Sequence, residues 1–167
     1  MIRQTSTTRR GVLLSIGAGG LAAVAGCLDD GIGVNGDPTY ERGEVPDLDA
    51  DERTAEELSA AEALAEREIH EGVTALDPLA IADHEFVLED DFRGPTVQGT
   101  VENAGDDRIE VVEVRVRVYG EDGEQLGRYL DSTGDLDGDS SWGFQVVLLE
   151  SPAEISDYDV AVLGTPT

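Results

Sequence analysis

The sequence contains no lysine, a single cysteine and only two histidines among its 167 residues. A single cysteine excludes an intrachain disulfide, a paired redox motif and a cysteine-rich zinc site. The eleven basic residues are all arginine, and they face 37 acidic residues, so the formal net charge is −26. Because binding to phosphates requires clustered lysine or arginine, this balance argues against nucleic acid as a partner.

The acidic excess also indicates the surroundings of the protein. So many like charges repel one another strongly in dilute buffer. At about 1 M salt the Debye length falls to roughly 3 Å, and this repulsion is largely screened. The composition therefore predicts a halophilic protein. The alternative, a disordered acidic chain, conflicts with the regular alternation of apolar residues in the C-terminal half.

Few residues point to catalysis or to a metal centre. No Gly-x-Ser-x-Gly turn presents a serine nucleophile, and neither His70 nor His84 has another histidine or a cysteine nearby in the sequence. We expect His70 to be solvated or to face a helix end. The acidic turn 135–139 fails the spacing of an EF-hand, because Ser140 stands where the turn glycine belongs. We therefore expect no enzyme activity, no catalytic residues, no metal ligands and no cofactor.

The first 26 residues contain no acidic side chain, in contrast to the rest of the chain. A basic start that includes Arg3 is followed by an apolar, glycine- and alanine-rich run over residues 11–26. This run is short for a membrane span, which needs about 20 residues. It is typical of the core of a signal peptide, and an uncleaved membrane anchor is the alternative.

Arg9 and Arg10, with one spacer residue and then an apolar stretch, resemble the twin-arginine export signal. Leu14 stands where that pattern often has lysine, which is a minor departure. The resemblance implies export of an already folded domain by the twin-arginine route, with the general secretory route as the alternative.

The apolar run ends in Val24, Ala25 and Gly26, followed by Cys27, and this order resembles a lipobox. The resemblance implies cleavage before Cys27 and attachment of a lipid to its thiol. We therefore expect residues 1–26 to be a lipoprotein signal peptide. The mature protein would lie outside the cytoplasm, anchored through this lipid to the outer face of the cell membrane. The alternative for Cys27 is an ordinary buried thiol.

Residues 27–50 are rich in glycine, aspartate and proline without periodicity, which predicts a flexible acidic spacer. Thr54 and Glu57 then form a capping-box pattern, and an alanine-, glutamate- and leucine-rich run predicts a helix over residues 51–72, ended by Gly72. Its apolar stripe either docks on the domain or binds a partner. The stripe comprises Leu58, Ala61, Leu64, Ala65 and Ile69.

From residue 84 to residue 163 the apolar period changes to two, which is typical of strands. Ile109 and Val111 have the opposite parity to the valines that follow, so we expect a bulge or a strand start near Val111. Asp122 and Gly123 predict a hairpin. Two sets of residues should face the core: Val112, Val114, Val116 and Val118, and Trp142, Phe144, Val146 and Leu148. About six short strands predict a mainly β fold, an antiparallel immunoglobulin-like β-sandwich preceded by one helix and the flexible spacer.

The same region, residues 84–163, carries an ordered set of short motifs. The set comprises Gly99-Thr100-Val101-Glu102-Asn103, the strand 112–118 with Tyr119, Asp122-Gly123, Leu126-Gly127, Leu136-Asp137-Gly138, Trp142-Gly143-Phe144 and Tyr158-Asp159. It resembles the FxLYD domain, a small immunoglobulin-like module common in lipoproteins of halophilic archaea and in bacterial surface proteins. Gly120 departs from the aspartate that members often have. The resemblance implies no activity and no catalytic residues.

These observations predict a non-catalytic, lipid-anchored surface protein whose sandwich mediates protein contact or envelope structure. Its partners would be the membrane, through the lipid, and an envelope or surface protein. The edge strands or the helix stripe would form the contact surface. The alternative is an extracytoplasmic module that binds a ligand or a divalent cation on its acidic loops.

Overall fold

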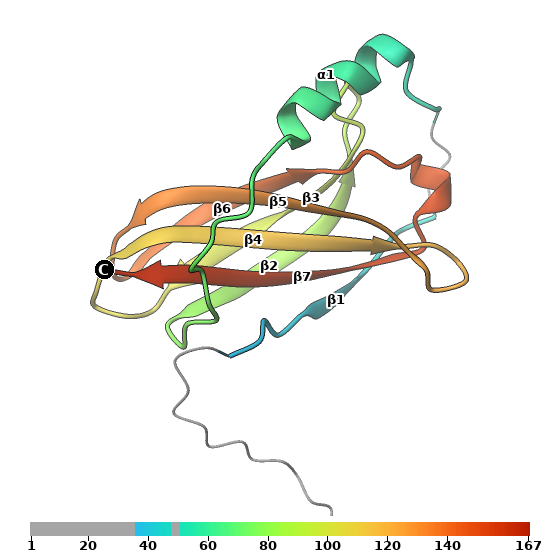
Figure 1. The fold of residues 1–167 in the computed structure, drawn as a ribbon. Coiled ribbons are helices and arrows are strands. Elements are labelled where there is room, and N and C mark those ends of the chain that lie inside the picture. The colour runs from blue at the N-terminus through green and yellow to red at the C-terminus, as the bar shows by residue number, and fades with distance from the viewer. Residues whose placement is uncertain (1–35, 48–50) are drawn as a thin grey trace, which may run out of the picture. The chain divides into compact units, whose positions relative to one another are not determined.

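The computed structural model describes residues 36–47 and 51–167, drawn in colour in Figure 1. The predictions for the export signal, the lipobox and Cys27 fall outside these residues and stay predictions. The strands are β1 (Glu41–Glu44), β2 (Leu79–Leu88), β3 (Pro95–Asn103), β4 (Ile109–Tyr119), β5 (Gln125–Leu136), β6 (Ser140–Val147) and β7 (Asp157–Pro166). One α-helix, α1 (Ala55–Ala65), and one short 3₁₀ turn (Pro152–Glu154) complete the elements. None of the helices in the described ranges is long and apolar enough to cross a membrane.

The strands form two antiparallel sheets, which confirms the predicted fold class (Figure 1). The first, sheet A, has the order β1-β7-β4-β5, and the second, sheet B, has the order β2-β3-β6. Alternating apolar residues let each sheet bury one face against the other. The two sheets therefore make a sandwich with a single apolar layer between them.

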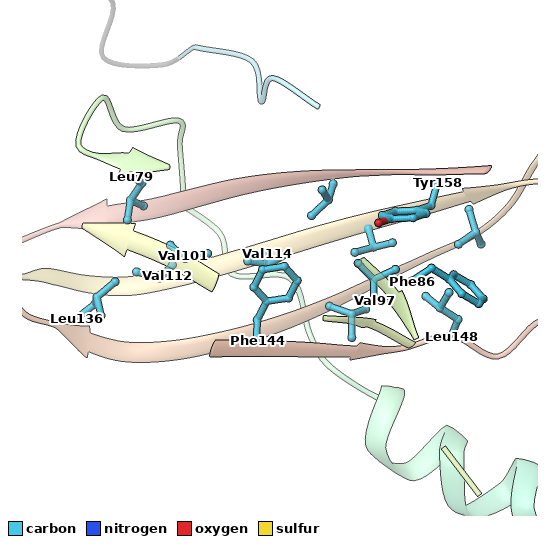
Figure 2. Close-up of a cluster of buried hydrophobic side chains, with 14 of the residues drawn as sticks. Leu79, Phe86, Val97, Val101, Val112, Val114, Leu136, Phe144, Leu148 and Tyr158 are labelled. Atoms are coloured by element: carbon cyan, nitrogen blue, oxygen red, sulfur yellow. The ribbon is translucent and has the colours of Figure 1, made fainter. Parts of the chain in front are cut away.

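The core contains the residues that the alternation predicted. The four even-numbered valines of β4 are fully buried, and Phe144, Val146 and Leu148 face them from the other sheet. Trp142 is partly buried against the same cluster. Figure 2 shows this layer, with Leu79 and Leu136 at one end and Tyr158, Phe86 and Leu148 at the other. Each large apolar side chain buried here contributes roughly 2 kcal/mol.

Two finer predictions about strand register are confirmed. The pairing of β4 with β7 shifts register between Ile109 and Val111, where the parity of the apolar residues breaks. The strands β4 and β5 form a hairpin, and its turn contains Gly123 with a φ of 77°. That backbone conformation is accessible to glycine without steric cost.

The predicted boundaries at the N-terminal side were wrong in three places. The predicted flexible spacer contains β1, whose residues Glu41–Glu44 pair with β7. The helix begins at Ala55 and ends at Ala65, not at residue 72, and the sandwich begins at Leu79, not at residue 84. The first error arises because an edge strand is held by backbone hydrogen bonds, which leave no apolar pattern in the sequence.

The start of α1 follows the predicted capping box. The Thr54 hydroxyl accepts a hydrogen bond from the Glu57 backbone N–H at 3.3 Å, and the Glu57 carboxylate accepts one from the Thr54 backbone N–H at 2.9 Å. The helix contacts β6, and Ala61 is fully buried. Leu64 is 44% exposed. The apolar stripe thus docks on the sandwich mainly through Ala61, with Leu58 partly buried, and leaves Leu64 and Ile69 in solvent.

Candidate functional site

The two long sides of the sandwich differ. On one side β5 and β6 meet, and the Asp131 carboxylate of β5 accepts a hydrogen bond from the Gln145 backbone N–H of β6 at 3.1 Å. On the opposite side the edge strands β1 and β2 belong to different sheets, and a groove of about 1110 Å³ lies between them. We call this the β1–β2 groove. Grooves between packed elements are common places for ligands.

The floor of the groove joins the two sheets through one hydrogen bond. Tyr158 of β7 is 1% exposed, and its hydroxyl lies 2.9 Å from Nδ1 of His84 on β2. The two rings pack edge to face with their centroids 5.6 Å apart, and Phe86 packs against the tyrosine from the same strand. Burial, followed by the nearby charge of Glu85, raises the pKa of Tyr158 to about 12. The phenol is therefore protonated at neutral pH.

Gly43 of β1 makes this arrangement sterically feasible. A Cβ atom at this position would collide with the ring and the hydroxyl of Tyr158. The absent side chain lets the tyrosine lie against β1 and reach across to His84. The sequence offered no signal for this role, because a single glycine in a spacer-like segment is typical of a loop.

The groove carries a net negative charge. Its charged lining consists of Arg42 against Glu44, Glu85 and Asp157. Arg42 Nε lies 3.2 Å from Asp157 Oδ1, an ion pair without hydrogen-bond geometry. The arginine is 78% exposed, so this pair contributes little stability. Within the described residues Glu44 and Glu85 belong to no ion pair, so the groove favours a cationic ligand.

A second polar cluster anchors the start of β1. The Arg117 guanidinium donates to the Asp159 carboxylate from Nε at 2.8 Å, and this bond raises the pKa of Arg117. The ring of Tyr40 stacks on the same guanidinium at 3.5 Å. A cation–π contact of this kind contributes about 1 kcal/mol. It holds the chain just before β1 against the outer face of sheet A.

Residues 66–74, which we call the strap, cross the outer face of sheet A (Figure 1). Arg67 lies 3.6 Å from Asp131 of β5, and Thr74 forms a bridge with Gly164 of β7. Between them His70 lies over β4. The strap thus spans three strands, and it replaces the last turns of the helix that the sequence predicted.

The strap covers a buried carboxylate, Glu113 of β4, which is 0% exposed. Glu113 Oε2 accepts a hydrogen bond from the His70 backbone N–H at 2.8 Å and lies 3.0 Å from His70 Nδ1. Glu113 Oε1 accepts from Arg115 Nε at 2.6 Å. Of the two alternatives predicted for His70, the helix end is wrong, because α1 ends at Ala65, and solvent exposure is confirmed. Its ring is 45% exposed, but its polar groups are held by this carboxylate.

Arg53 attaches the start of the helical segment to the sandwich. Its guanidinium donates to three backbone carbonyls: those of Arg93 at 2.9 Å, Leu148 at 2.9 Å and Glu150 at 3.1 Å. Burial lowers the pKa of Arg53, while the nearby Glu150 charge opposes this shift. All of these acceptors are neutral main-chain groups, so this arginine has a structural role.

The acidic loops do not converge on a metal site. Asp135 and Asp139 both adopt left-handed backbone conformations, with φ of 57° and 54°, and Asp135 pairs with Arg108. The part of the chain that the structure describes contains no group of three histidine, cysteine, aspartate or glutamate residues placed to hold a metal ion. The alternative of a cation-binding module therefore has no candidate ligand set in this region.

Asn103, the last residue of one motif in the FxLYD-like set, has a structural role here. It is 1% exposed. Its amide donates to the carbonyls of Asp107 at 2.9 Å and Asp137 at 3.0 Å, and its oxygen accepts from the Gly105 N–H at 3.1 Å. One buried side chain thus joins the β3–β4 and β5–β6 loops.

Comparisons with known proteins give limited information. No family model matches the chain, so the resemblance to the FxLYD domain stays a prediction. An uncharacterized protein from Methanocaldococcus jannaschii is 29% identical over 87 residues, covering 51% of this chain. The chain matches only 64% of that relative's length. A DUF1425 family member from Shewanella sp. pv-4 matches 57% of this chain and 92% of its own, with 12% identity and a TM-score of 0.38.

Proposed function

We propose that this chain is an exported, lipid-anchored protein that presents its β-sandwich as a non-catalytic binding module on the outer face of the cell membrane. A lipid on Cys27 is the membrane attachment, and an envelope or surface protein is the partner. The observation that carries the binding role is the β1–β2 groove, which leaves one side of the sandwich open while the other side is closed.

The anchoring role is supported by the sequence of the N-terminal segment and by the position of β1. Arg9 and Arg10 resemble an export signal, and the residues before Cys27 resemble a lipobox. Because β1 begins at Glu41, only residues 28–40 separate the proposed lipid from the sandwich. Even fully extended, such a segment spans at most about 45 Å. A lipid on Cys27 would therefore tether β1 through a segment no longer than this.

The non-catalytic role is supported by the chemistry of the groove. Its two groups best suited to proton transfer, His84 and Tyr158, bind each other at 2.9 Å. Burial also raises the pKa of Tyr158 to about 12, far above the range in which a general acid or base works best. The groove is acidic, and His84 and Tyr158 on its floor are bonded to each other. These features favour binding of a cationic ligand.

Mass spectrometry of the native protein tests the anchor. We expect the mature chain to begin at residue 27 and to carry the mass of a lipid on Cys27. The Cys27→Ser variant should lose the lipid and leave the membrane fraction, and replacing Arg9 and Arg10 by lysine should block export. A native chain with residue 1 intact, unmodified and in the cytosol would overturn the proposal.

Site-specific crosslinking in intact cells tests the binding role. A photoreactive amino acid at Glu85, in the groove, should give a crosslinked product at native salt. The same amino acid at Glu121, in the β4–β5 turn, should not, because that turn lies outside the groove lining. Identical crosslinking patterns at the two positions would argue against the groove as the contact surface.

A further inference from the structure

We propose that the β1–β2 groove binds an extended, basic peptide segment of a partner protein, which adds as a strand along the free edge of β2. This inference names the ligand class of the binding module proposed above and rests on that function. It does not depend on the lipid anchor, because the groove belongs to the sandwich itself. Strand addition to an exposed sheet edge is a common mode of peptide recognition.

The free edge of β2 provides the backbone groups that such a peptide needs. In the described part of the chain β2 is the terminal strand of sheet B and pairs only with β3, while β1 and β7 of sheet A lie close to it across the groove. A bulge interrupts its pairing between Ile81 and Asp83, and residues 83–88 then pair with β3 in unbroken register. Six residues of regular strand extend for about 20 Å, which matches a peptide of similar length.

This edge has only part of the protection that usually blocks strand addition. Proteins protect exposed edges with proline, with charged residues such as lysine, with β-bulges, with short strands or with a covering element. The segment 83–88 contains no proline and no lysine, and it belongs to a ten-residue strand. Its bulge, between Ile81 and Asp83, adjoins the groove residue His84, and the residues after it stay in regular register with β3. The opposite edge of sheet B differs, because Asp131 accepts the Gln145 N–H there.

Charge complementarity selects a basic segment over a neutral or acidic one. The charged lining combines one arginine with three carboxylates, and Arg42 is already paired with Asp157. Glu44 and Glu85 remain outside the ion pairs of the described residues, on the two walls of the groove. At about 1 M salt only charges within roughly 3 Å of contact still attract strongly. An arginine or lysine on the added strand would therefore increase the affinity only if it contacted these carboxylates directly.

The floor of the groove limits what the peptide can insert. The Tyr158 ring fills the space beside Gly43, and its hydroxyl is already bonded to His84. A peptide therefore lies across the floor instead of inserting a side chain into the core. Recognition then depends on backbone hydrogen bonds to β2 and on contacts with the walls.

Binding of a synthetic peptide to the full chain tests the inference. The probe is a capped peptide in which arginine and threonine alternate with valine, followed by fluorescence anisotropy in about 1 M NaCl. Two matched peptides replace arginine by glutamate or carry N-methyl groups on the valine backbone. We expect binding by the arginine peptide and at least tenfold weaker binding by each control, because the first control loses the charge and the second loses the backbone donors.

A pair of matched variants locates the site. Glu85→Arg should weaken binding at least tenfold, whereas Glu121→Arg, an equal charge change at an exposed turn position, should leave it unchanged. Thermal unfolding of both variants checks that they remain folded. Hydrogen exchange should slow at the amides of residues 83–88 when the arginine peptide is added.

Several results would overturn the inference. They are absence of binding by the arginine peptide, equal affinity for the glutamate peptide, equal effects of the two variants, or slowed exchange confined to another strand. None of these results bears on the lipid at Cys27. Failure of this inference is therefore distinguishable from failure of the proposed membrane anchor.

Discussion

Replacing Glu113 by alanine tests how the strap is held on sheet A. The side chain is fully buried and receives two hydrogen bonds, from the His70 N–H and from Arg115, with His70 Nδ1 as a third contact. Removing one partner of a buried charged pair costs about 3–5 kcal/mol. Because the His70 ring is 45% exposed and Arg115 is 17% exposed, solvent partly replaces the lost bonds. We therefore expect the lower value, about 3 kcal/mol.

Chemical denaturation and thermal unfolding in molar salt measure this loss. For a domain of this size about 3 kcal/mol corresponds to a Tm lower by roughly 10 °C. The matched control is Glu110→Ala, an exposed glutamate on the same strand, which should change stability by less than about 0.5 kcal/mol. Glu113→Gln retains one acceptor oxygen, so its loss of stability should lie between those of Glu113→Ala and Glu110→Ala.

Hydrogen exchange separates strap release from a general loss of stability. In Glu113→Ala the amide of His70 should exchange much faster, since its acceptor is gone. The amides of the central strand β4 should change only in proportion to the global stability. The reasoning would be refuted if Glu113→Ala lost no more stability than Glu110→Ala, or if the exchange of the His70 amide were unchanged.

Four further predictions concern the groove, the helix and the charge of the surface. Gly43→Val should displace Tyr158 and detach β1, seen as fast exchange of the β1 amides. Gly36→Val, where a Cβ atom would meet only the Ala75 Cβ at 3.9 Å, should not do so. Because the pKa of Tyr158 is raised from 10.0 to about 12 in the folded state, the unfolded state releases its proton first. The tighter hold of the folded state on this proton stabilises the protein below about pH 10. This stabilisation is lost as the pH rises to about 12, which lowers the free energy of unfolding by about 2 kcal/mol. Denaturation at several pH values should show a smaller decline in Tyr158→Phe than in the wild type, and an equal decline in both would contradict the assignment. Arg53→Ala should lower the free energy of unfolding by about 2 kcal/mol, because three carbonyls lose their donor. In the same denaturation assay Arg53→Lys should restore only part of this loss. Lowering NaCl from about 2 M to about 0.1 M should destabilise the protein by lengthening the range of acidic repulsion, and a Tm independent of salt would contradict the predicted halophilic adaptation.

The strands and the core could be predicted from the sequence because their signal is local. Every second residue of β4 from Val112 to Val118 is apolar, and a strand that buries one face must place these side chains together. The break in parity at Val111 located the register shift for the same reason. The capping box of Thr54 and Glu57 was equally local, since it spans a single helical turn.

The end of the helix illustrates where local signals failed. The alanine- and glutamate-rich composition favours helix beyond Ala65, but the chain leaves the helical conformation at Glu66. His70 instead gives its backbone N–H to Glu113, 43 residues away. A hydrogen bond to a buried carboxylate is stronger than the few tenths of a kcal/mol by which composition favours another helical turn.

The candidate site could not be predicted from the sequence, for a related reason. Gly43, His84 and Tyr158 come from three segments separated by tens of residues, and no local pattern in the sequence indicates that they meet. Their meeting depends on β1 pairing with the first residues of β7, which places Gly43 beside Tyr158. That pairing is made by backbone groups that every residue possesses.

The sequence alone determined the acidic character of the chain, the alternating strands and the face that each strand buries, because these follow from side-chain chemistry and from period two. It also contains short stretches that resemble export and lipidation signals, which remain predictions. Only the tertiary structure decided that one side of the sandwich is closed and the other open, that the strap covers Glu113, and that a spacer-like segment supplies an edge strand. These features depend on contacts between distant residues, whose geometry exists only after the two sheets have packed.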